Sequence, residues 1–382
     1  MAPSDVAIIG VGLHPFGRHP GKSALEMGAD AVFEALTDAG VEWPAIQALY
    51  AGSMEVKNPE AIVGLLGLTG SPGRAVFTGC ATGATSLAMA ANAIRLGEAD
   101  LAIAVGLDKH PRGAFSDHPS VSGLPDWYGE AGLFLTTHFF GMKINRYMHD
   151  FGISPLTLAR AAAKAFRNGA ANPKAWRRKP MTEEEILSSQ YLNYPLTQYM
   201  YCGPDEGGAA AILCRADQAH RYTDQPIYLR ASTLFSRREG AFELLSPSLP
   251  LESAPSPTVF ASREAYEIAG LGPQDVDVVQ LQDTDAGSEI IHMAENGFCE
   301  DGEQEKLLAE GATEIGGRLP VNTDGGLLAN GEPVGASGLR QVYELVTQLR
   351  GRAGDRQVEG ARVGYAQLYG APGTAAVTIL ST

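Results

Sequence analysis

The feature that most constrains the fold of this 382-residue chain is an internal repeat. Residues 29–50 read ADAVFEALTDAGVEWPAIQALY, and residues 259–281 read VFASREAYEIAGLGPQDVDVVQL. Each segment has a helical pattern that ends in Ala-Gly, then a short polar link, and then an apolar or alternating strand. The chain therefore contains two copies of one helix–strand unit.

A second pair of similar segments follows in the same order. Residues 80–97 read CATGATSLAMAANAIRLG, and residues 334–351 read VGASGLRQVYELVTQLRG. Each begins with a small-residue turn, runs into a helix and leads toward a β-rich segment. Two echoes in one order predict two similar α/β halves, residues 1–225 and 226–382, whose mixed or parallel sheets carry helices on both faces.

Residues 115–205 interrupt this repeat and predict a long insertion of the first half. The segment is rich in aromatic residues, Pro and charge, and it predicts helices over 136–150 and 155–170. We expect it to lie over the site, because long insertions in compact domains are usually functional. Two fates are open for its aromatic side chains, the lining of a wide apolar pocket or ordinary packing and dimer contacts. These residues are Trp127, Tyr128, Phe139, Phe140, Tyr194, Tyr199 and Tyr201.

Charge and cysteine usage argue against several classes of protein. The net charge of −15 disfavours non-specific nucleic-acid binding, which needs a basic surface. Charged and small residues break every apolar stretch before the roughly 18 residues of a membrane span, and the N-terminus lacks the pattern of a secretory signal. The four cysteines form no CxxC pair, so we expect no metal site and a reducing, cytoplasmic location.

Cys80 is the first candidate for chemistry. It lies between a strand-like stretch and a helix of small residues. The positive end of a helix dipole lowers the pKa of a thiol, so this position predicts a raised thiolate fraction. The alternative is a buried cysteine with a purely structural role.

Three further segments carry candidate groups. The Gly-rich segment 322–338 places Glu332 in a loop just before a helix, and its amides are suited to hold an oxyanion. Gln282 and Asp283 lie at the end of a strand, where Asp283, like Asp285, is either a helix cap or a catalytic group. Tyr369 stands at the tip of two C-terminal strands, as a strand residue or as a phenol that transfers protons.

Three motifs together resemble the thiolases of the sterol-carrier-protein type. They are FTGCATGATSLAMAANAI with AVGLDKHPRG, NPKAWRRKPMT, and PVNTDGGLLANGEPVGASG with QLRG. The resemblance covers nearly the whole chain and implies a five-layer αβαβα core with a loop domain over the site. It also implies a CoA thioester as substrate, no tightly bound cofactor, and a homodimer whose interface includes the strand before Cys80.

The same resemblance assigns roles and exposes departures. Cys80 matches the nucleophilic cysteine of the family. Glu332 stands where the GHP motif has its histidine, and Gln282 and Thr284 replace the histidine and cysteine of the HDCF motif. Ordinary thiolases carry a second catalytic cysteine near the position of Tyr369. No histidine occurs in the GEP or QDTD segments, so His138 in the insertion, and then His110, are the candidates to compensate.

The CoA part of the substrate needs a local binding patch on this acidic chain. Arg177 and Arg178, with Lys179, form a basic run that suits the CoA phosphates, although a solvated charged loop is the alternative. We also assign Gly335 and Ser337 in the small-residue turn to the CoA part.

Three functions follow from these features. A carboxylate and a phenol suit retro-aldol cleavage of a 3-hydroxyacyl-CoA, which needs no acyl-enzyme. The alternatives are a thiolase or acetyl-CoA acyltransferase that uses Cys80 covalently, and a non-catalytic lipid-binding subunit. The chain also resembles the lipid-transfer proteins, whose steroid side-chain aldolases work with a small partner containing a zinc ribbon and an OB fold. This likeness implies such a partner and a bulky acyl group.

Overall fold

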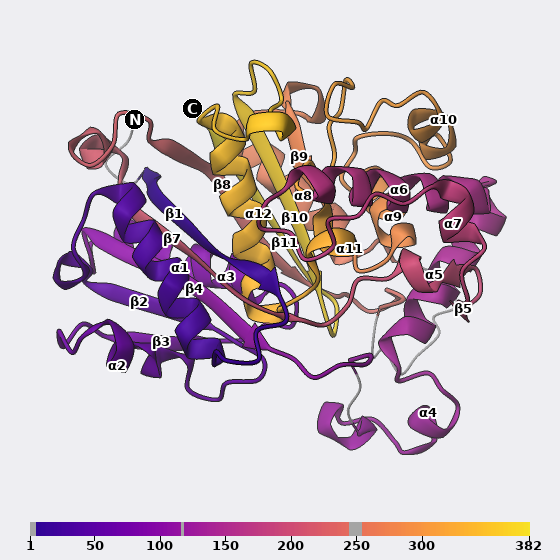
Figure 1. Cartoon of the computed structure of the whole chain (residues 1–382), viewed down its shortest axis with the longest axis horizontal. Helices are drawn as coiled ribbons and strands as arrows, with labels where there is room; N and C mark the ends of the chain where they lie inside the picture. The colour runs from indigo at the N-terminus through magenta and orange to yellow at the C-terminus, as the bar shows by residue number, and fades with distance from the viewer. Residues whose placement is uncertain (1–4, 116–117, 244–253) are drawn as a thin grey trace.

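One mixed sheet of nine strands forms the frame of the protein (Figure 1). The computed structural model describes residues 5–115, 118–243 and 254–382. The strand order is β3-β2-β4-β7-β1-β8-β11-β10-β9, so the strands of the two halves lie on opposite sides of the β1–β8 pair. β1 and β8 pair antiparallel over a short stretch in which Val6 faces Leu229 and Ile8 faces Ile227. None of the described helices is long and apolar enough to cross a membrane.

The first half contributes five strands, of which all but β3 are largely buried, and a helix on each face of them. Its strands are β1 (Val6–Gly17), β2 (Ala48–Gly52), β3 (Gly73–Val76), β4 (Leu101–Lys109) and β7 (Glu206–Arg215). Its helices outside the insertion are α1 (Ala24–Ala39), the short α2 (Val63–Leu66) and α3 (Thr82–Arg95). β2 runs parallel to β3 and β4, whereas β1 and β4 pair antiparallel with β7. The sheet is therefore mixed, as the repeat predicts.

The second half repeats this construction. Its strands are β8 (Ile227–Ser236), β9 (Val278–Gln280), β10 (Val363–Gly370) and β11 (Thr374–Ser381). Its helices are α8 (Pro257–Ala269), α9 (Ala286–Glu295), α10 (Gln304–Ala309), α11 (Gly326–Asn330) and α12 (Val334–Leu349). α1 and α8 end alike, at Gly40 and Gly270 with φ of 64° and 65°, and a 3-10 turn then leads to β2 or β9. The boundary predicted after residue 225 lies in the link before β8.

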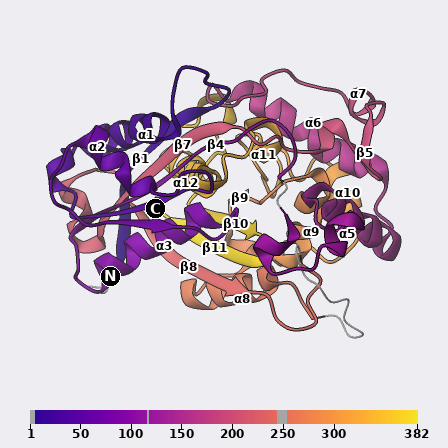
Figure 2. The same ribbon diagram turned by 90° about the horizontal axis from the view of Figure 1, so that it is seen from below.

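Three buried clusters show that these elements form five layers. α1 packs on the outer face of the first half, where Val32 and Ile103 belong to one cluster. α3 and α12 lie in the centre, where Leu87 and Val342 share a cluster with strands of both halves. α8 covers the outer face of the second half. Figure 2 shows the order from α1 at the top to α8 at the bottom, which confirms the predicted αβαβα core.

α3 and α12 cross at a contact that requires glycine on both helices. A Cβ atom on Gly83 would lie 2.8 Å from the amide nitrogen of Leu339, and one on Gly338 would lie 2.9 Å from that of Ala84. Any side chain at either position would push the helices apart, because protein interiors are close-packed. Both helices begin near this crossing, so the loops that precede them are brought together.

The insertion between β4 and β7 is largely helical and is held against the second half. Its elements are α4 (Trp127–Glu130), α5 (Thr136–Phe151), α6 (Pro155–Ala171), α7 (Glu183–Leu187), β5 (Tyr191–Asn193) and β6 (Leu196–Thr197). α5 and α6 confirm the helices predicted at 136–150 and 155–170. A buried ion pair joins α6 to α9, with Lys164 Nζ 2.6 Å from Glu289 Oε1. Asn322 donates to the other oxygen of Glu289 at 2.9 Å.

Candidate active site

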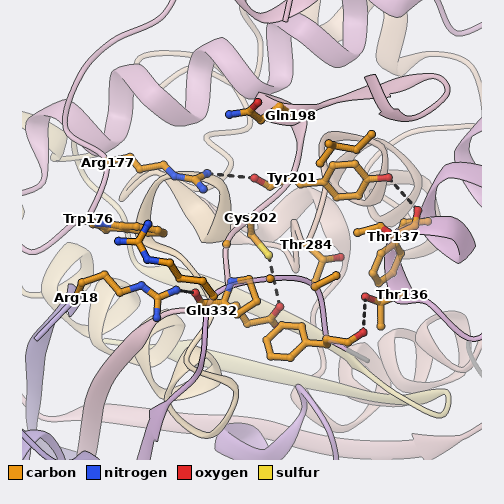
Figure 3. Close-up of a pocket in the computed structure, with 18 residues that line it drawn as sticks. Arg18, Thr136, Thr137, Trp176, Arg177, Gln198, Tyr201, Cys202, Thr284 and Glu332 are labelled. Atoms are coloured by element: carbon orange, nitrogen blue, oxygen red, sulfur yellow. Dashed lines mark hydrogen bonds between the residues drawn. The ribbon is translucent and has the colours of Figure 1, made fainter. Parts of the chain in front are cut away.

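Loops from both halves bring four polar side chains together beneath the insertion. Cys80 precedes α3, and Cys202 lies in the last part of the insertion, before β7. Gln282 follows β9, and Glu332 lies between α11 and α12. The main chain fixes two of these loops to each other, because the amide of Glu332 donates to the carbonyl of Gly203 at 3.0 Å. Figure 3 shows the Cys202 thiol directed toward the Glu332 carboxyl group.

Glu332 accepts hydrogen bonds from the three other side chains. Its side chain is buried, Oε1 accepts from Gln282 Nε2 at 2.9 Å, and Oε2 accepts from Cys202 Sγ at 3.5 Å. Burial raises the pKa of Glu332, while the hydrogen bonds from Cys80, Cys202 and Gln282 partly offset this because they stabilise the carboxylate. A carboxyl group whose pKa is raised toward neutrality is suited to general acid/base catalysis.

Cys80 is not the low-pKa thiol that its position before a helix predicts. Burial raises the pKa of the Cys80 thiol well above its usual value, and the neighbouring Glu332 carboxyl raises it further. The prediction of a raised thiolate fraction is therefore wrong. A helix N-terminus supplies only a partial positive charge, whereas low-polarity surroundings and a nearby carboxylate both disfavour a thiolate.

Cys202 is a candidate functional residue that the sequence reasoning missed. It lines the same cavity as Glu332, and burial, followed by the charge of Glu332, raises the pKa of its thiol well above the usual value. Its one sequence signal is its place in YCGPDEGG, directly before a buried strand. Nothing in that pattern distinguishes it from a structural cysteine. Within the part of the chain that the structure describes, no three His, Cys, Asp or Glu side chains are grouped to hold a metal ion.

The structure favours His110 over His138 as the histidine that influences the site. His110 Nε2 accepts from the amide of Val334 at 3.1 Å, two residues after Glu332. His138 instead contacts the carbonyl of Gly132 within the insertion. The insertion does cover the site, as expected, but it does so with other residues.

Asp285 caps the helix that follows it, which is one of the two roles that the sequence left open, whereas Asp283 accepts from the first turn of a different helix, α11. Asp283 Oδ1 accepts from the amide of Leu327 at 2.7 Å at the start of α11. Asp285 Oδ1 accepts from the amide of Ser288 at 3.0 Å at the start of α9. Asp283 thereby holds the helix that leads into the Glu332 loop, and a direct catalytic role for it stays a prediction.

Gly335 and Ser337, which we assigned to CoA binding, lie in the buried first turn of α12. The amide of Gly335 donates to Asp108 Oδ2 at 2.6 Å, and the hydroxyl of Ser337 donates to the carbonyl of Val334 at 3.3 Å. Neither residue lines the cavity beside Glu332, and their contact with CoA stays a prediction. The amides of Val334 and Gly335 are already used, by His110 and Asp108, so they are not free to hold an oxyanion.

Tyr369 lies near the end of β10, directly before Gly370, which packs closely against the main chain of Cys80. Its ring packs in a cluster with Phe139 and faces Lys143 Nζ at 5.5 Å from the ring centre. The ring of His292 lies 6.2 Å away. Tyr369 does not line the cavity that contains Glu332, so its role as a proton-transferring group stays a prediction.

A cavity of about 350 Å³ opens beside Cys202 and Glu332 and is closed on one side by the insertion (Figure 3). Of the seven aromatic residues that the sequence offered for an apolar pocket, Phe140 and Tyr201 line it. The rest of its surface is partly polar and includes Thr284. The cavity has the size of a small-molecule site.

The two arginines expected to bind the CoA phosphates are separated by the fold. Arg177 lines the cavity, where its Nη1 donates to the carbonyls of Tyr201 and Leu328 at 3.1 and 2.9 Å. Arg178 is exposed and does not line the cavity. Their joint binding of the CoA phosphates stays a prediction.

Comparison with known proteins identifies the family. Residues 6–181 match the family described as thiolase, N-terminal domain, and residues 252–382 match the thiolase C-terminal domain-like family. The chain is 36% identical to the acetyl-CoA acetyltransferase of Methanothermobacter thermautotrophicus, over 99% of each chain. The protein belongs to the thiolase superfamily.

Further relatives place the chain in the sterol-carrier-protein-type branch of the superfamily. It is 31% identical to sterol carrier protein 2 of Gallus gallus, over 98% of this chain and 71% of that protein. The solved Ltp2-ChsH2(DUF35) aldolase is 25% identical and superposes with a TM-score of 0.88, over 100% of this chain and 99% of that chain. This thiolase-superfamily protein is therefore an enzyme that acts on acyl-CoA.

The hydrogen bonds to Glu332 predict how its titration responds to substitution. If ionised Glu332 is the active form, kcat/KM for an acyl-CoA substrate falls as the pH drops through the raised pKa of this group. Gln282→Leu and Cys202→Ala each remove a donor that lowers this pKa, so the acid limb should move to higher pH.

The test is the pH dependence of kcat/KM for these variants and for Cys299→Ala, which removes a thiol that does not line the cavity. The control should keep the acid limb of the unmodified enzyme. A limb that stays in place, or moves to lower pH, in the Gln282 variant would show that Glu332 is not the titrating group.

Proposed function

We propose that this enzyme cleaves 3-hydroxyacyl-CoA esters by a retro-aldol reaction in which Glu332 transfers the proton. The support is the arrangement at Glu332, a buried carboxyl group that accepts from Gln282 and from two thiols whose pKa values are raised. Such a carboxyl group can take a proton from a hydroxyl group. A covalent thiolase cycle needs a thiolate at Cys80, which the same surroundings disfavour.

The proposed reaction moves one proton and breaks one carbon–carbon bond. The Glu332 carboxylate takes the proton of the β-hydroxyl group, and the Cβ–O bond becomes the carbonyl of an aldehyde or ketone product. The Cα–Cβ bond breaks, and its electron pair forms the thioester enolate. Protonated Glu332 then returns the proton to Cα, which releases the shortened acyl-CoA. Gln282 holds the carboxyl group in place throughout, through its bond to Oε1.

The second candidate function is acyl transfer through a covalent bond to Cys80. It is favoured by the 36% identity to an acetyl-CoA acetyltransferase and by the position of Cys80 just before α3. The raised pKa of Cys80 and the carboxyl group in place of the family's histidine weigh against it. A non-catalytic subunit is not proposed, because the chain is an enzyme of this superfamily.

The two candidates predict opposite results for two substitutions. Glu332→Gln should lower kcat for cleavage of a 3-hydroxyacyl-CoA by about 10²–10⁴-fold, the usual contribution of a positioned acid/base group. Cys80→Ala should keep a substantial part of the activity, because the retro-aldol route forms no bond to the thiol. Aldehyde release, measured with and without free CoA, distinguishes cleavage from thiolysis.

Loss of turnover in Cys80→Ala, with retention in Glu332→Gln, would refute the retro-aldol assignment and favour the thiolase. Cleavage that requires free CoA would likewise refute the retro-aldol assignment and favour the thiolase. Circular dichroism of both variants serves as the control for folding.

We also propose a homodimer formed through β3. This strand lies at the edge of the sheet, most of its residues are exposed, and Phe77 directly after it is 57% exposed. An unpaired edge beside an exposed aromatic ring is a surface suited to a second copy, and self-complementary dimers are the commonest assembly.

Sedimentation at micromolar concentration should therefore give twice the chain mass of 40.3 kDa. Phe77→Glu should give folded monomers, whereas Leu96→Glu, at an exposed position at the end of α3, should remain dimeric. A folded, monomeric unmodified protein would refute the proposal.

A small partner with a zinc ribbon and an OB fold is a further proposal. Its support is the likeness to a solved aldolase that combines Ltp2 with ChsH2(DUF35). Turnover by the chain with and without such a partner decides whether one is required. A steroid side chain or other bulky lipid has weaker support as the acyl group, because three arginines line the cavity.

A further inference from the structure

One wall of the cavity carries three positively charged side chains, and only one of them has an ion-pair partner among the described residues. Arg18, Arg112 and Arg177 line the cavity, and Glu332 is the only acidic side chain among the described residues that line it. Figure 3 shows Arg18 and Arg177 on one side with Trp176 between them, and their guanidinium carbons lie 5.6 and 4.9 Å from the ring centre of Trp176. This cationic wall contrasts with the net charge of −15 of the chain.

Arg177 has one edge of its guanidinium group available. Nη1 donates to the carbonyls of Tyr201 and Leu328, which fixes the plane of the group. Nε and Nη2 make no hydrogen bond to any described residue. Neither atom is fully buried, so both are accessible to a ligand. These two nitrogens form the side-on edge of arginine, which matches the two oxygens of a carboxylate.

Arg112 and Arg18 differ in how far they are already engaged. Arg112 is exposed at the cavity and forms no ion pair with a described residue. Arg18 donates to the carbonyls of His110 and Pro204 and lies 3.4 Å from Glu206 Oε1, so it is largely satisfied by the protein. Arg177 and Arg112 are therefore the two cations with capacity for a ligand.

The carboxyl group that influences Arg177 from within the protein does not serve as its counter-ion. Asp205 is fully buried, no described residue donates a hydrogen bond to either of its oxygens, and it forms no ion pair within 4.0 Å. Burial raises the pKa of Asp205 well above its usual value, which favours its neutral form. A half-buried cation without a counter-ion loses hydration energy that a bound anion restores.

We propose that the acyl group of the substrate carries a carboxylate that binds Arg177 and Arg112. This inference rests on the proposed function, because it places the thioester beside Glu332 in the same cavity. Arg177 then faces atoms a few bonds from the reacting carbon. The CoA phosphates lie at the far end of the pantetheine arm, outside a cavity of about 350 Å³. The substrate class is the CoA monothioester of a short 3-hydroxy-dicarboxylic acid.

The test compares two esters of equal chain length, 3-hydroxyadipyl-CoA and 3-hydroxyhexanoyl-CoA, which differ in a terminal carboxylate against a methyl group. The unmodified enzyme should prefer the first by about tenfold or more in kcat/KM, the usual effect of one charge-assisted pair. Arg177→Gln and Arg112→Gln should each reduce this preference by lowering kcat/KM for the carboxylated ester alone. Arg112→Gln keeps the test open if Arg177→Gln does not fold, because Arg112 makes no hydrogen bond to a described residue.

Arg146→Gln is the matched control, since it makes the same charge change on the exposed face of α5 and should keep the preference. Equal kcat/KM for the two esters in the unmodified enzyme would overturn the proposal. An equal loss for both esters in the Arg177 and Arg112 variants would also overturn it and assign these residues to the CoA phosphates.

Calorimetric binding of both esters to Glu332→Gln separates this inference from the proposed function. If neither ester is cleaved by the unmodified enzyme, the retro-aldol assignment fails, and the binding preference alone then decides the carboxylate site. The site is supported if Glu332→Gln binds the carboxylated ester more tightly than the other ester, and if the double variant Glu332→Gln, Arg112→Gln binds the two esters equally. Equal binding of the two esters refutes it.

Discussion

The close crossing of α3 and α12 is the contact on which the site depends. The two helices approach so nearly that Gly83 and Gly338 leave no room for a Cβ atom. Each helix is preceded by a loop with a candidate reacting group, Cys80 before α3 and Glu332 before α12. Because the helices come from equivalent positions of two similar halves, duplication of the fold itself brings these loops together. The insertion then covers them.

Burial has opposite consequences for the chemistry of the thiols and of the carboxyl group at this site. Burial favours the neutral form of a thiol and of a carboxyl group alike, and it raises the pKa of Cys80, Cys202 and Glu332. For Glu332 this moves the pKa toward the range in which a proton can be taken and returned. For Cys80 it moves the pKa away from the range in which a thiolate forms. A carboxyl group in place of a histidine therefore shifts the balance from covalent to proton-transfer chemistry.

Much of the fold and part of the site are readable from the sequence, for physical reasons that differ between residues. The two similar α/β halves follow from the repeat, because hydrophobic periodicity is local and the two copies constrain each other, whereas the five layers follow from the family resemblance. Cys80, Gln282 and Glu332 stand at the ends of strands and starts of helices, and the structure brings these three together. Cys202 was missed because its role depends on which loop lies opposite it.

The sign of the Cys80 pKa shift depends on burial and on a carboxyl group that is distant in the sequence. The local sequence pattern reveals neither, so the helix dipole alone predicts the wrong sign for the Cys80 pKa shift.

The most direct measurement is intact-protein mass spectrometry of the enzyme quenched during turnover of a 3-hydroxyacyl-CoA. Retro-aldol cleavage with Glu332 as the acid/base predicts the unmodified chain mass at every time point. An acyl adduct on Cys80 that forms at the rate of turnover would contradict it.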